Sequence, residues 1–258
     1  MADGIGLQEI ILIAILVLLL FGPKGVSGIM RDLGRWTGKM KRYRDEFTRE
    51  LMAMSEPVFT PEEIKQNERK RIREQCKKAM VELQPEEREK ENKDIRTKLE
   101  TLPEFISANR IFCFISKQEE VDTLTIISNL LKSGKEVFAP YCIDKTKDLG
   151  LAQISDLKSD LEPGIFNIPE PKKDLRKQVD PLSIDLFIIP GLAFDHEMTR
   201  LGRGAGYFDR FLQDIKGRKP ICGICFNCQV YPYIIPPEEH DINPDCIVTP
   251  LTIIRQRT

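Results

Sequence analysis

The chain has 258 residues, enough for one large domain and an accessory segment. Its 39 lysines and arginines nearly balance its 40 aspartates and glutamates, so the overall charge gives no support for binding to nucleic acid. The seven cysteines are odd in number and are not spaced like those of a secreted disulfide framework, which favours reduced thiols in a cytosolic domain.

Residues 10–21, with the sequence IILIAILVLLLF, form an unbroken apolar run. As a helix this run would reach about 18 Å, less than the roughly 30 Å hydrocarbon core, and an upstream extension would bring Gln8 and Glu9 to the membrane edge. A signal peptide fits less well, because Asp3 and Glu9 precede the run and no small-residue cleavage site follows it. A buried core helix is the other alternative. We predict a short transmembrane helix within residues 1–22.

Residues 23–54 follow a GPKG break and are predicted to form a basic amphipathic helix at a membrane interface. Apolar residues recur there every three or four positions as far as Leu51, and lysines and arginines occupy the other face. A helix packed on the soluble domain is the alternative. Because the basic residues follow the apolar run and none precedes it, the positive-inside rule places the C-terminal side in the cytoplasm.

The short apolar helix, the FGP hinge and the basic amphipathic helix together resemble the TatA/TatB subunits of the twin-arginine translocase. The resemblance covers residues 5 to about 52 and does not separate the TatA type from the TatB type. It implies a single-span protein of a prokaryotic inner membrane, with membrane lipid and other Tat subunits as partners.

Two prolines within residues 52–61, MAMSEPVFTP, end this pattern and mark a domain boundary. We predict a linker at residues 55–61 and a soluble domain at residues 62–258. Met52 and Met54 leave open an internal translation start, which would give a product without the membrane segment.

Short apolar strands alternate with helices along the soluble domain. We expect helices from residue 60 to about 81, over 84–102 and over 119–135, and strands within 110–116, 136–142, 183–195, 220–226 and 245–249. This alternation predicts an α/β fold, with a mostly parallel sheet and helices on both faces. Ligands of such folds bind where the carboxyl ends of strands meet the starts of helices.

The stretch CGICFNC contains Cys222, Cys225 and Cys228 at a spacing that thiolate ligands of a metal can have. No fourth ligand or nearby histidine completes such a site, and the interleaved isoleucines and phenylalanine are typical of a buried strand. We therefore interpret these cysteines as structural.

The sequence LGRGAGYFD, residues 201–209, places three glycines before an aromatic pair and an acid. Amides at Gly204, Ala205 and Gly206 suit an anionic ligand, and Arg200 and Arg203 can neutralise phosphate oxygens. The spacing matches neither the dinucleotide-binding fingerprint nor the Walker A loop. The pattern alone leaves phosphate binding and an ordinary tight turn both open.

The longer stretch PGLAFDHEMTRLGRGAGYFDRFL closely resembles the C-terminal motif of the 5-formyltetrahydrofolate cyclo-ligase family. Further motifs of that family follow in order, namely KRIREQCKKAMVELQPEER, FISKQEEVDTLTIISNLLKSGKEVFAP, GIFNIPEP and IPPEEHDINPDCIVT, so the resemblance spans residues 64–249. It implies an ATP-dependent closure of 5-formyltetrahydrofolate to 5,10-methenyltetrahydrofolate, with release of ADP and phosphate.

The resemblance also implies roles for individual residues. ATP would be bound by the opening helix and the glycine-rich stretch, through Lys70, Arg73, Arg200, Leu201, Gly202, Arg203, Gly204, Ala205 and Gly206. Mg²⁺ would be held by Asp209 and Asp245. The folate would contact Glu120, Asp122, Phe166, Asn167, Ile168, Pro169 and Tyr207, and the catalytic residues would be Arg200, Arg203 and Tyr207.

Two positions depart from the family pattern. Phe208 stands where members often carry a second tyrosine, so a hydroxyl contact is lost. Ala205 stands where members commonly have glycine or lysine, which weakens any expectation of a lysine at the transferred phosphate.

The alternative function is a translocase subunit whose folate-enzyme-like domain is not catalytic and serves assembly or sensing.

Overall fold

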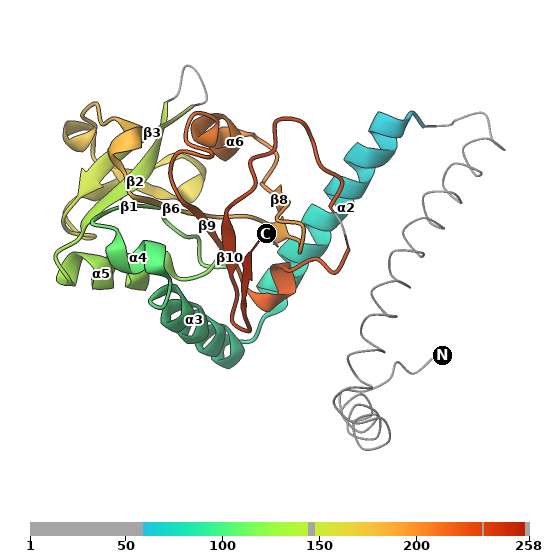
Figure 1. The fold of residues 1–258 in the computed structure, drawn as a ribbon, viewed down its shortest axis with the longest axis horizontal. Coiled ribbons are helices and arrows are strands. Elements are labelled where there is room, and N and C mark those ends of the chain that lie inside the picture. The colour runs from blue at the N-terminus through green and yellow to red at the C-terminus, as the bar shows by residue number, and fades with distance from the viewer. Residues whose placement is uncertain (1–58, 144–147, 234, 256–258) are drawn as a thin grey trace. The chain divides into compact units, whose positions relative to one another are not determined.

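The computed structural model describes residues 59–143, 148–233 and 235–255, and a grey trace marks the others (Figure 1). The predicted transmembrane helix at residues 1–22, the amphipathic helix at 23–54 and most of the linker therefore lie outside the described residues. The chain divides into two units between Pro61 and Glu62. No helix in the described ranges is both long enough and apolar enough to cross a membrane.

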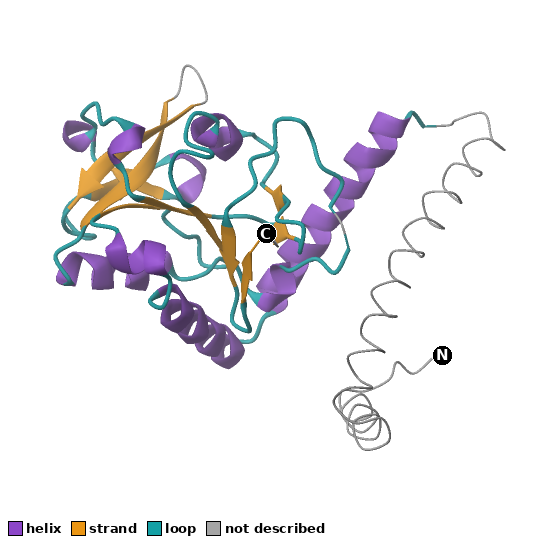
Figure 2. Cartoon of the chain, in the orientation of Figure 1, coloured by secondary structure: helices purple, strands orange, loops and turns teal. Residues whose placement is uncertain are grey.

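A sheet of seven strands lies at the centre of the described unit, in the order β11-β10-β9-β6-β1-β2-β3 (Figures 1 and 2). The five inner strands run parallel: β10 (Cys246–Val248), β9 (Ile221–Ile224), β6 (Leu186–Ile189), β1 (Arg110–Cys113) and β2 (Glu136–Ile143). The edge strands β3 (Asp148–Ile154) and β11 (Ile253–Arg255) pair antiparallel. The predicted mostly parallel sheet is confirmed, although the sequence analysis predicted neither edge strand.

The first three helices in the described part of the chain each begin with a proline, whose fixed φ angle suits the first turn of a helix. They are α2 (Pro61–Glu82), α3 (Pro85–Leu99) and α4 (Pro103–Ser107). Helix α5 (Thr123–Lys132) begins differently, because the side chain of Asp122 accepts a hydrogen bond from the amide of Thr125 at 3.1 Å. Helix α6 (Tyr207–Leu212) follows the glycine-rich stretch.

The inner strands bury side chains on both faces of the sheet, as successive strand residues alternate in direction. Ile111 belongs to a core cluster formed with α3, α4 and α5, whereas the next residue, Phe112, belongs to a second cluster that includes Leu212 of α6. Helices therefore cover both faces, as the sequence predicts. In Figure 1, α3, α4 and α5 lie on one side of the sheet and α6 on the other.

Two small hairpins extend from the sheet: β4 (Leu161–Pro163) with β5 (Pro169–Pro171), and β7 (Ala193–Phe194) with β8 (Arg200–Leu201). Helix α2 packs on the second hairpin, since Ile72 and Cys76 form a buried cluster with Ala193, Leu201 and Ile235. Single turns of 3₁₀ helix occupy Ile165–Asn167, Lys173–Leu175, Pro181–Ser183 and Asn227–Gln229.

The three cysteines of CGICFNC lie on and after β9. Cys222 and Cys225 are fully buried, which agrees with the interpretation of this stretch as a core strand. Burial raises the pKa of the Cys225 thiol and raises that of Cys228 to about 11. No cysteine belongs to a group of three metal-ligating side chains within the described part of the chain.

Candidate functional site

A cavity of about 380 Å³ opens at the carboxyl ends of β1, β2 and β6. Residues that follow or end these strands line it, among them Phe114, Tyr141 and Gly191. The stretch that connects β8 to α6, residues 202–206 and here called the glycine loop, forms part of its wall. This is the edge at which parallel α/β sheets bind ligands, and the volume lies within the range of small-molecule sites.

The shape of the glycine loop depends on two residues with positive φ angles. Gly204 has a φ of +100° and Gly206 a φ of +68°, values that residues with a side chain rarely adopt. The hairpin before the loop is held by the buried carboxylate of Asp195, which accepts hydrogen bonds from the amides of Thr199 and Ile235, both at 2.8 Å. The loop is therefore positioned by the fold before any ligand arrives.

Arg200 joins the elements around the cavity. It is 2% exposed, and its guanidinium forms an ion pair with Asp209 of α6. The same guanidinium donates to the backbone carbonyls of Pro190 and Ile242, both at 3.3 Å. Arg200 thus ties the end of β6 and the segment before β10 to α6. It borders the cavity, and each of its three guanidinium nitrogens donates to a protein acceptor.

Arg203 of the glycine loop pairs with an acid from the other side of the cavity. Its Nη2 lies 2.6 Å from Oε1 of Glu120 and 3.4 Å from Oε1 of Glu119. Burial lowers the pKa of Arg203, but the two glutamates outweigh burial and leave it above its ordinary value. Arg203, which is predicted to bind phosphate, and Glu120, which is predicted to bind the folate, are therefore in direct contact.

Helix α2 presents two arginines, one turn apart, toward the cavity region. Arg69 is buried and binds both carboxylate oxygens of Asp241, at 2.7 and 2.9 Å. Arg73 donates from Nε to the carbonyl of Gly202 at 3.0 Å, and burial together with the nearby Arg69 charge lowers its pKa. Lys70 is exposed and does not line the cavity, so its place beside the phosphates stays a prediction.

The sequence signal that separates these side chains is helical spacing. Arg69, Ile72, Arg73 and Cys76 follow the i, i+3, i+4, i+7 pattern of one helix face, and that face packs on the β7-β8 hairpin. Lys70 lies one position away from Arg69, on a different face. Sequence reasoning therefore missed Arg69, although Ile72 and Cys76 indicated the buried side.

The two predicted metal ligands lie at opposite edges of the sheet. Asp209 borders the cavity and accepts a hydrogen bond from the amide of Ile242 at 3.2 Å. Asp245 precedes β10, where its Oδ2 accepts from the amide of Ile221, the first residue of β9, at 2.8 Å. Because β9 and β10 are parallel, Asp245 lies at the amino edge, and it cannot share an ion with Asp209.

Asp241, which was not among the predicted site residues, lies next to the residues that border the cavity, unlike Asp245. It precedes Ile242, whose carbonyl and amide bind Arg200 and Asp209. Burial raises the pKa of Asp241, but the hydrogen bonds from Arg69 and from the amide of Glu238 outweigh burial and hold it below its ordinary value. Both of its oxygens are thus committed to protein donors in this structure.

The residues predicted to contact the folate divide into two groups. Glu120, Ile168 and Tyr207 line the cavity. Asp122 does not, because its carboxylate caps α5 through the amide and hydroxyl of Thr125. Asn167 and Pro169 are exposed on either side of Ile168, and the side chain of Phe166 lies outside the described part of the structure.

Most of the residues that are predicted to bind ATP lie together at the cavity. The cavity is lined by Arg200, Gly202, Arg203, Ala205 and Gly206. Gly204 lies just outside it, and a Cβ built there would be 3.7 Å from the guanidinium carbon of Arg73. Leu201 instead faces the buried cluster under α2, so its contribution to the site is through the position of the loop backbone.

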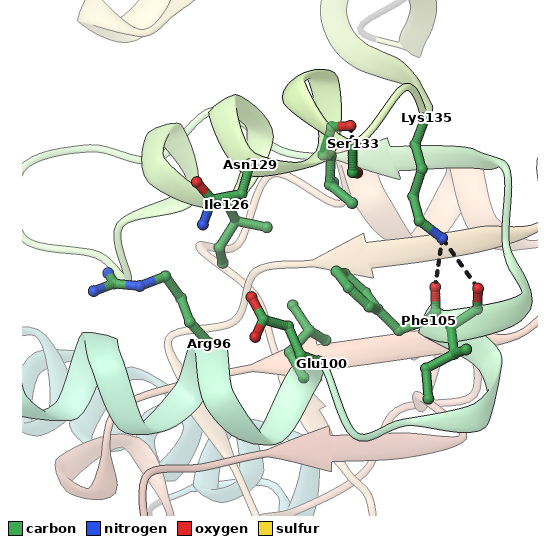
Figure 3. A pocket seen from close by; sticks show the side chains of 10 residues that line it. Arg96, Glu100, Phe105, Ile126, Asn129, Ser133 and Lys135 are labelled. Carbon is green, nitrogen blue, oxygen red and sulfur yellow. Dashed lines mark hydrogen bonds between the residues drawn. The ribbon is translucent and has the colours of Figure 1, made fainter.

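A second cavity, of about 340 Å³, lies between α3, α4 and α5 (Figure 3). Its floor is apolar, and Lys135 at its rim donates to the carbonyls of Phe105 and Ile106 at 3.0 and 3.2 Å (Figure 3). None of the residues predicted to bind ATP, folate or metal lines it. The cavity at the carboxyl edge is therefore the better candidate site.

Comparison with known families agrees with this choice. Residues 65–250 match the 5-formyltetrahydrofolate cyclo-ligase family, and residues 4–50 match the mttA/Hcf106 family, which comprises proteins of the TatA/TatB type. Both resemblances noted in the sequence are thereby confirmed. The first match contains the glycine loop, α2 from residue 65 onward and the segment before β10.

Individual relatives cover most of the described unit. The chain is 30% identical to the mitochondrial 5-formyltetrahydrofolate cyclo-ligase of Arabidopsis thaliana, over 80% of this chain and 83% of the relative. It is 34% identical to the Escherichia coli K12 5-formyltetrahydrofolate cyclo-ligase, over 65% of this chain and 92% of the relative. A 5,10-methenyltetrahydrofolate synthetase from Aquifex aeolicus aligns with a TM-score of 0.64 and 29% identity, over 74% of this chain and 93% of that structure.

Proposed function

Because the chain belongs to the 5-formyltetrahydrofolate cyclo-ligase family, we propose that it is an enzyme that converts 5-formyltetrahydrofolate and ATP to 5,10-methenyltetrahydrofolate, ADP and phosphate. The observation that carries the proposal is the cavity at the carboxyl edge. There a preformed glycine loop and the ion pair between Arg203 and Glu120 border a largely apolar pocket. One end suits phosphate oxygens, and the other suits a flat heterocycle.

In the proposed reaction the formyl oxygen attacks the γ-phosphorus of ATP and the bond to ADP breaks. N10 then attacks the activated formyl carbon and loses its proton, and phosphate leaves with the former formyl oxygen. Phosphoryl transfer of this kind depends mainly on positioning and on neutralising charge. Arg203 and the amides of the glycine loop would contact the phosphates, and Arg73 would support the loop from behind through Gly202.

Arg200 has a different part in this scheme from the one expected. Its guanidinium is bound to Asp209 and to two backbone carbonyls, so we assign it the positioning of α6 and the cavity floor. Tyr207 lines the cavity at the start of α6, beside the phosphate end, and would contact the formyl-bearing part of the folate. Glu120 and Ile168 would bind the pterin from the opposite wall.

The family resemblance implies Mg²⁺, and the donor chemistry of the cavity can be tested against it. Mg²⁺ is usually bound by one or two carboxylates together with substrate phosphates. Asp209 meets that requirement, because the bonds described for its carboxylate all use Oδ1. We propose Asp209 as a ligand, and we exclude Asp245 because of its place at the other edge. When bound, the ion would neutralise charge on the transferring phosphate.

We further propose that residues 1–54 anchor the chain in a prokaryotic inner membrane, with a single span and the C-terminal domain in the cytoplasm. The match of residues 4–50 to the mttA/Hcf106 family supports membrane association, with lipid and other Tat subunits as partners. Fractionation of cells that express the full chain, compared with a chain lacking residues 1–55, tests the anchor. Recovery of the full chain in the soluble fraction would contradict it.

The same family match supports a role in translocation, so the second candidate function is a translocase subunit whose folate-enzyme-like domain is not catalytic. The full chain, purified in a mild detergent, separates the two. On addition of 5-formyltetrahydrofolate, we expect the absorbance of methenyltetrahydrofolate to appear only when ATP is present. A folded protein that gives no such absorbance would rule out the enzyme and leave the translocase subunit.

A further inference from the structure

A buried carboxylate that the proposed reaction does not use lies on the cavity wall. Glu170, on β5, is 5% exposed and lines the cavity beside Ile168. Its Oε1 accepts from the amide of Ile165 at 3.4 Å, and its Oε2 accepts from Arg176 at 3.3 Å. A carboxylate has about four acceptor positions, so these two long hydrogen bonds leave it able to accept more.

Arg176 holds this carboxylate together with a second one. Its Nη2 lies 3.3 Å from Oε2 of Glu170 and 3.3 Å from Oε1 of Glu162, and its Nε donates to the carbonyl of Pro171 at 2.9 Å. Glu162 and Glu170 are directly paired across the β4-β5 hairpin. Two carboxylates share one guanidinium, so the cluster keeps a net negative charge that favours N–H donors on its cavity side.

The same arginine fixes the neighbouring aromatic wall. Its guanidinium carbon lies 4.8 Å from the ring centroid of Tyr141, which also lines the cavity. Tyr141 pairs with Gly150 across β2 and β3, and a Cβ built at Gly150 would lie 2.2 Å from the ring. The ring therefore rests against the glycine backbone, and only glycine leaves room for it. Tyr141 is held in one position without any ligand.

We propose that Glu170 is a second carboxylate that binds the N–H edge of the pterin, with Arg176 as the residue that positions it. This inference rests on the proposed function, because the pterin is the part of that substrate that requires such acceptors. A reduced pterin carries its 2-amino group, N3–H and N8–H, more donors than Glu120 accepts while it is paired with Arg203. Tyr141 provides the flat wall along which the ring lies.

The chain offers a matched control for this proposal. Glu162→Gln removes the other carboxylate at the same distance from Arg176, but Glu162 does not line the cavity. In the full chain we expect Glu170→Gln to raise the KM for 5-formyltetrahydrofolate about tenfold, the usual scale for a hydrogen bond to a charged group. The KM for ATP and the Tm stay unchanged. Glu162→Gln, which removes a charge but no acceptor on the cavity wall, leaves these two unchanged as well and raises the KM for the folate far less than Glu170→Gln does. Equal effects of the two variants, or none from Glu170→Gln, would overturn the proposal.

Binding measured without turnover separates this inference from the proposed function. Calorimetric titration of the full chain with 5-formyltetrahydrofolate alone should show the same tenfold weakening in Glu170→Gln. If the wild-type chain binds the folate but forms no product, the proposed function fails while the Glu170 contact stands. If the wild-type chain forms product and Glu170→Gln binds equally well, the Glu170 contact fails and the function stands.

The role of Arg176 is tested by a double-mutant cycle. If Arg176 acts through Glu170, Arg176→Ala should weaken the binding of the folate but not that of ATP. The double variant Glu170→Gln, Arg176→Ala should then bind the folate no more weakly than the worse of the two single variants. Additive losses would mean that Arg176 contributes only to folding of the hairpin, and would overturn the positioning role. Arg176→Lys, which keeps the charge but not the planar fork, should restore part of the affinity.

Discussion

The two edges of the sheet use the same kind of side chain for different purposes. At the amino edge, Asp185 precedes β6 and Asp245 precedes β10. Each accepts hydrogen bonds from backbone amides where the neighbouring strand begins: Asp185 from Asn109 and Arg110, both at 2.9 Å, and Asp245 from Ile221 at 2.8 Å. These acids hold parallel strands in register.

At the carboxyl edge the acids pair with arginines. Asp209 pairs with Arg200, Glu120 with Arg203, and Glu170 with Arg176, and all three acids border the cavity. These acids line the cavity and can meet a ligand there, whereas a hydrogen bond to a strand amide is part of the fold itself. An acid at a strand end is therefore a candidate ligand only when it lies at the carboxyl edge.

The largest expected effect is a loss of stability when an acid at the carboxyl edge is removed, compared with removal of an acid at the amino edge. Asp209→Ala leaves the buried Arg200 guanidinium without its partner, so the free energy of unfolding should fall by about 3–5 kcal/mol. Urea denaturation of the described domain, followed by circular dichroism, measures the change. Asp245→Ala serves as the control, and an equal loss in both variants would contradict the distinction between the edges.

The second effect concerns activity rather than stability. Arg203→Ala should lower kcat/KM about 100-fold, the scale for the loss of one charge-stabilising donor. Lys70→Ala should stay within about twofold, because an exposed cation outside the cavity is screened by water. Initial rates of methenyltetrahydrofolate formation at varied ATP measure both. A comparable loss in Lys70→Ala would instead place Lys70 at the phosphates, as the sequence predicts.

A smaller effect is expected at the amino edge. Asp245→Asn should lower the free energy of unfolding by about 1 kcal/mol, the value of one hydrogen bond, because the amide oxygen accepts less strongly than a carboxylate. Activity should be retained at saturating Mg²⁺. A rise in the Mg²⁺ concentration needed for half-maximal rate would instead place Asp245 at the metal.

The smallest effect depends on pH. Burial raises the pKa of Asp185, but the amides of Arg110 and Asn109 outweigh burial and leave it below its usual 3.8. A lowered folded-state pKa adds stability above the unfolded value, and that contribution is lost as the pH falls through the folded one. Asp185→Asn should therefore be less stable than wild type at pH 7, with the difference shrinking below pH 4. A difference independent of pH would contradict this role.

Much of the fold followed from local patterns. Prolines and acids marked the starts of α2 and α3, and the apolar runs marked β1, β2, β6, β9 and β10. The edge strands β3 and β11 carried weaker signals, because an edge strand is half exposed and needs no continuous apolar run. The position of an acid relative to a strand could also be read from the sequence. An aspartate just before a parallel strand, as in DCIVT, lies at the amino end of that strand.

The sequence by itself therefore determined the family, the order of the inner strands and longer helices and the glycine loop, since each depends on residues close together in the chain. Only the tertiary structure decided which charged residues meet. Arg203 and Glu120 are separated by 83 positions, and Arg69 and Asp241 by 172. Partners so distant are brought together by strand order and helix packing, so whether a cation faces a ligand, an acid or water was settled only when the sheet and α2 were in place.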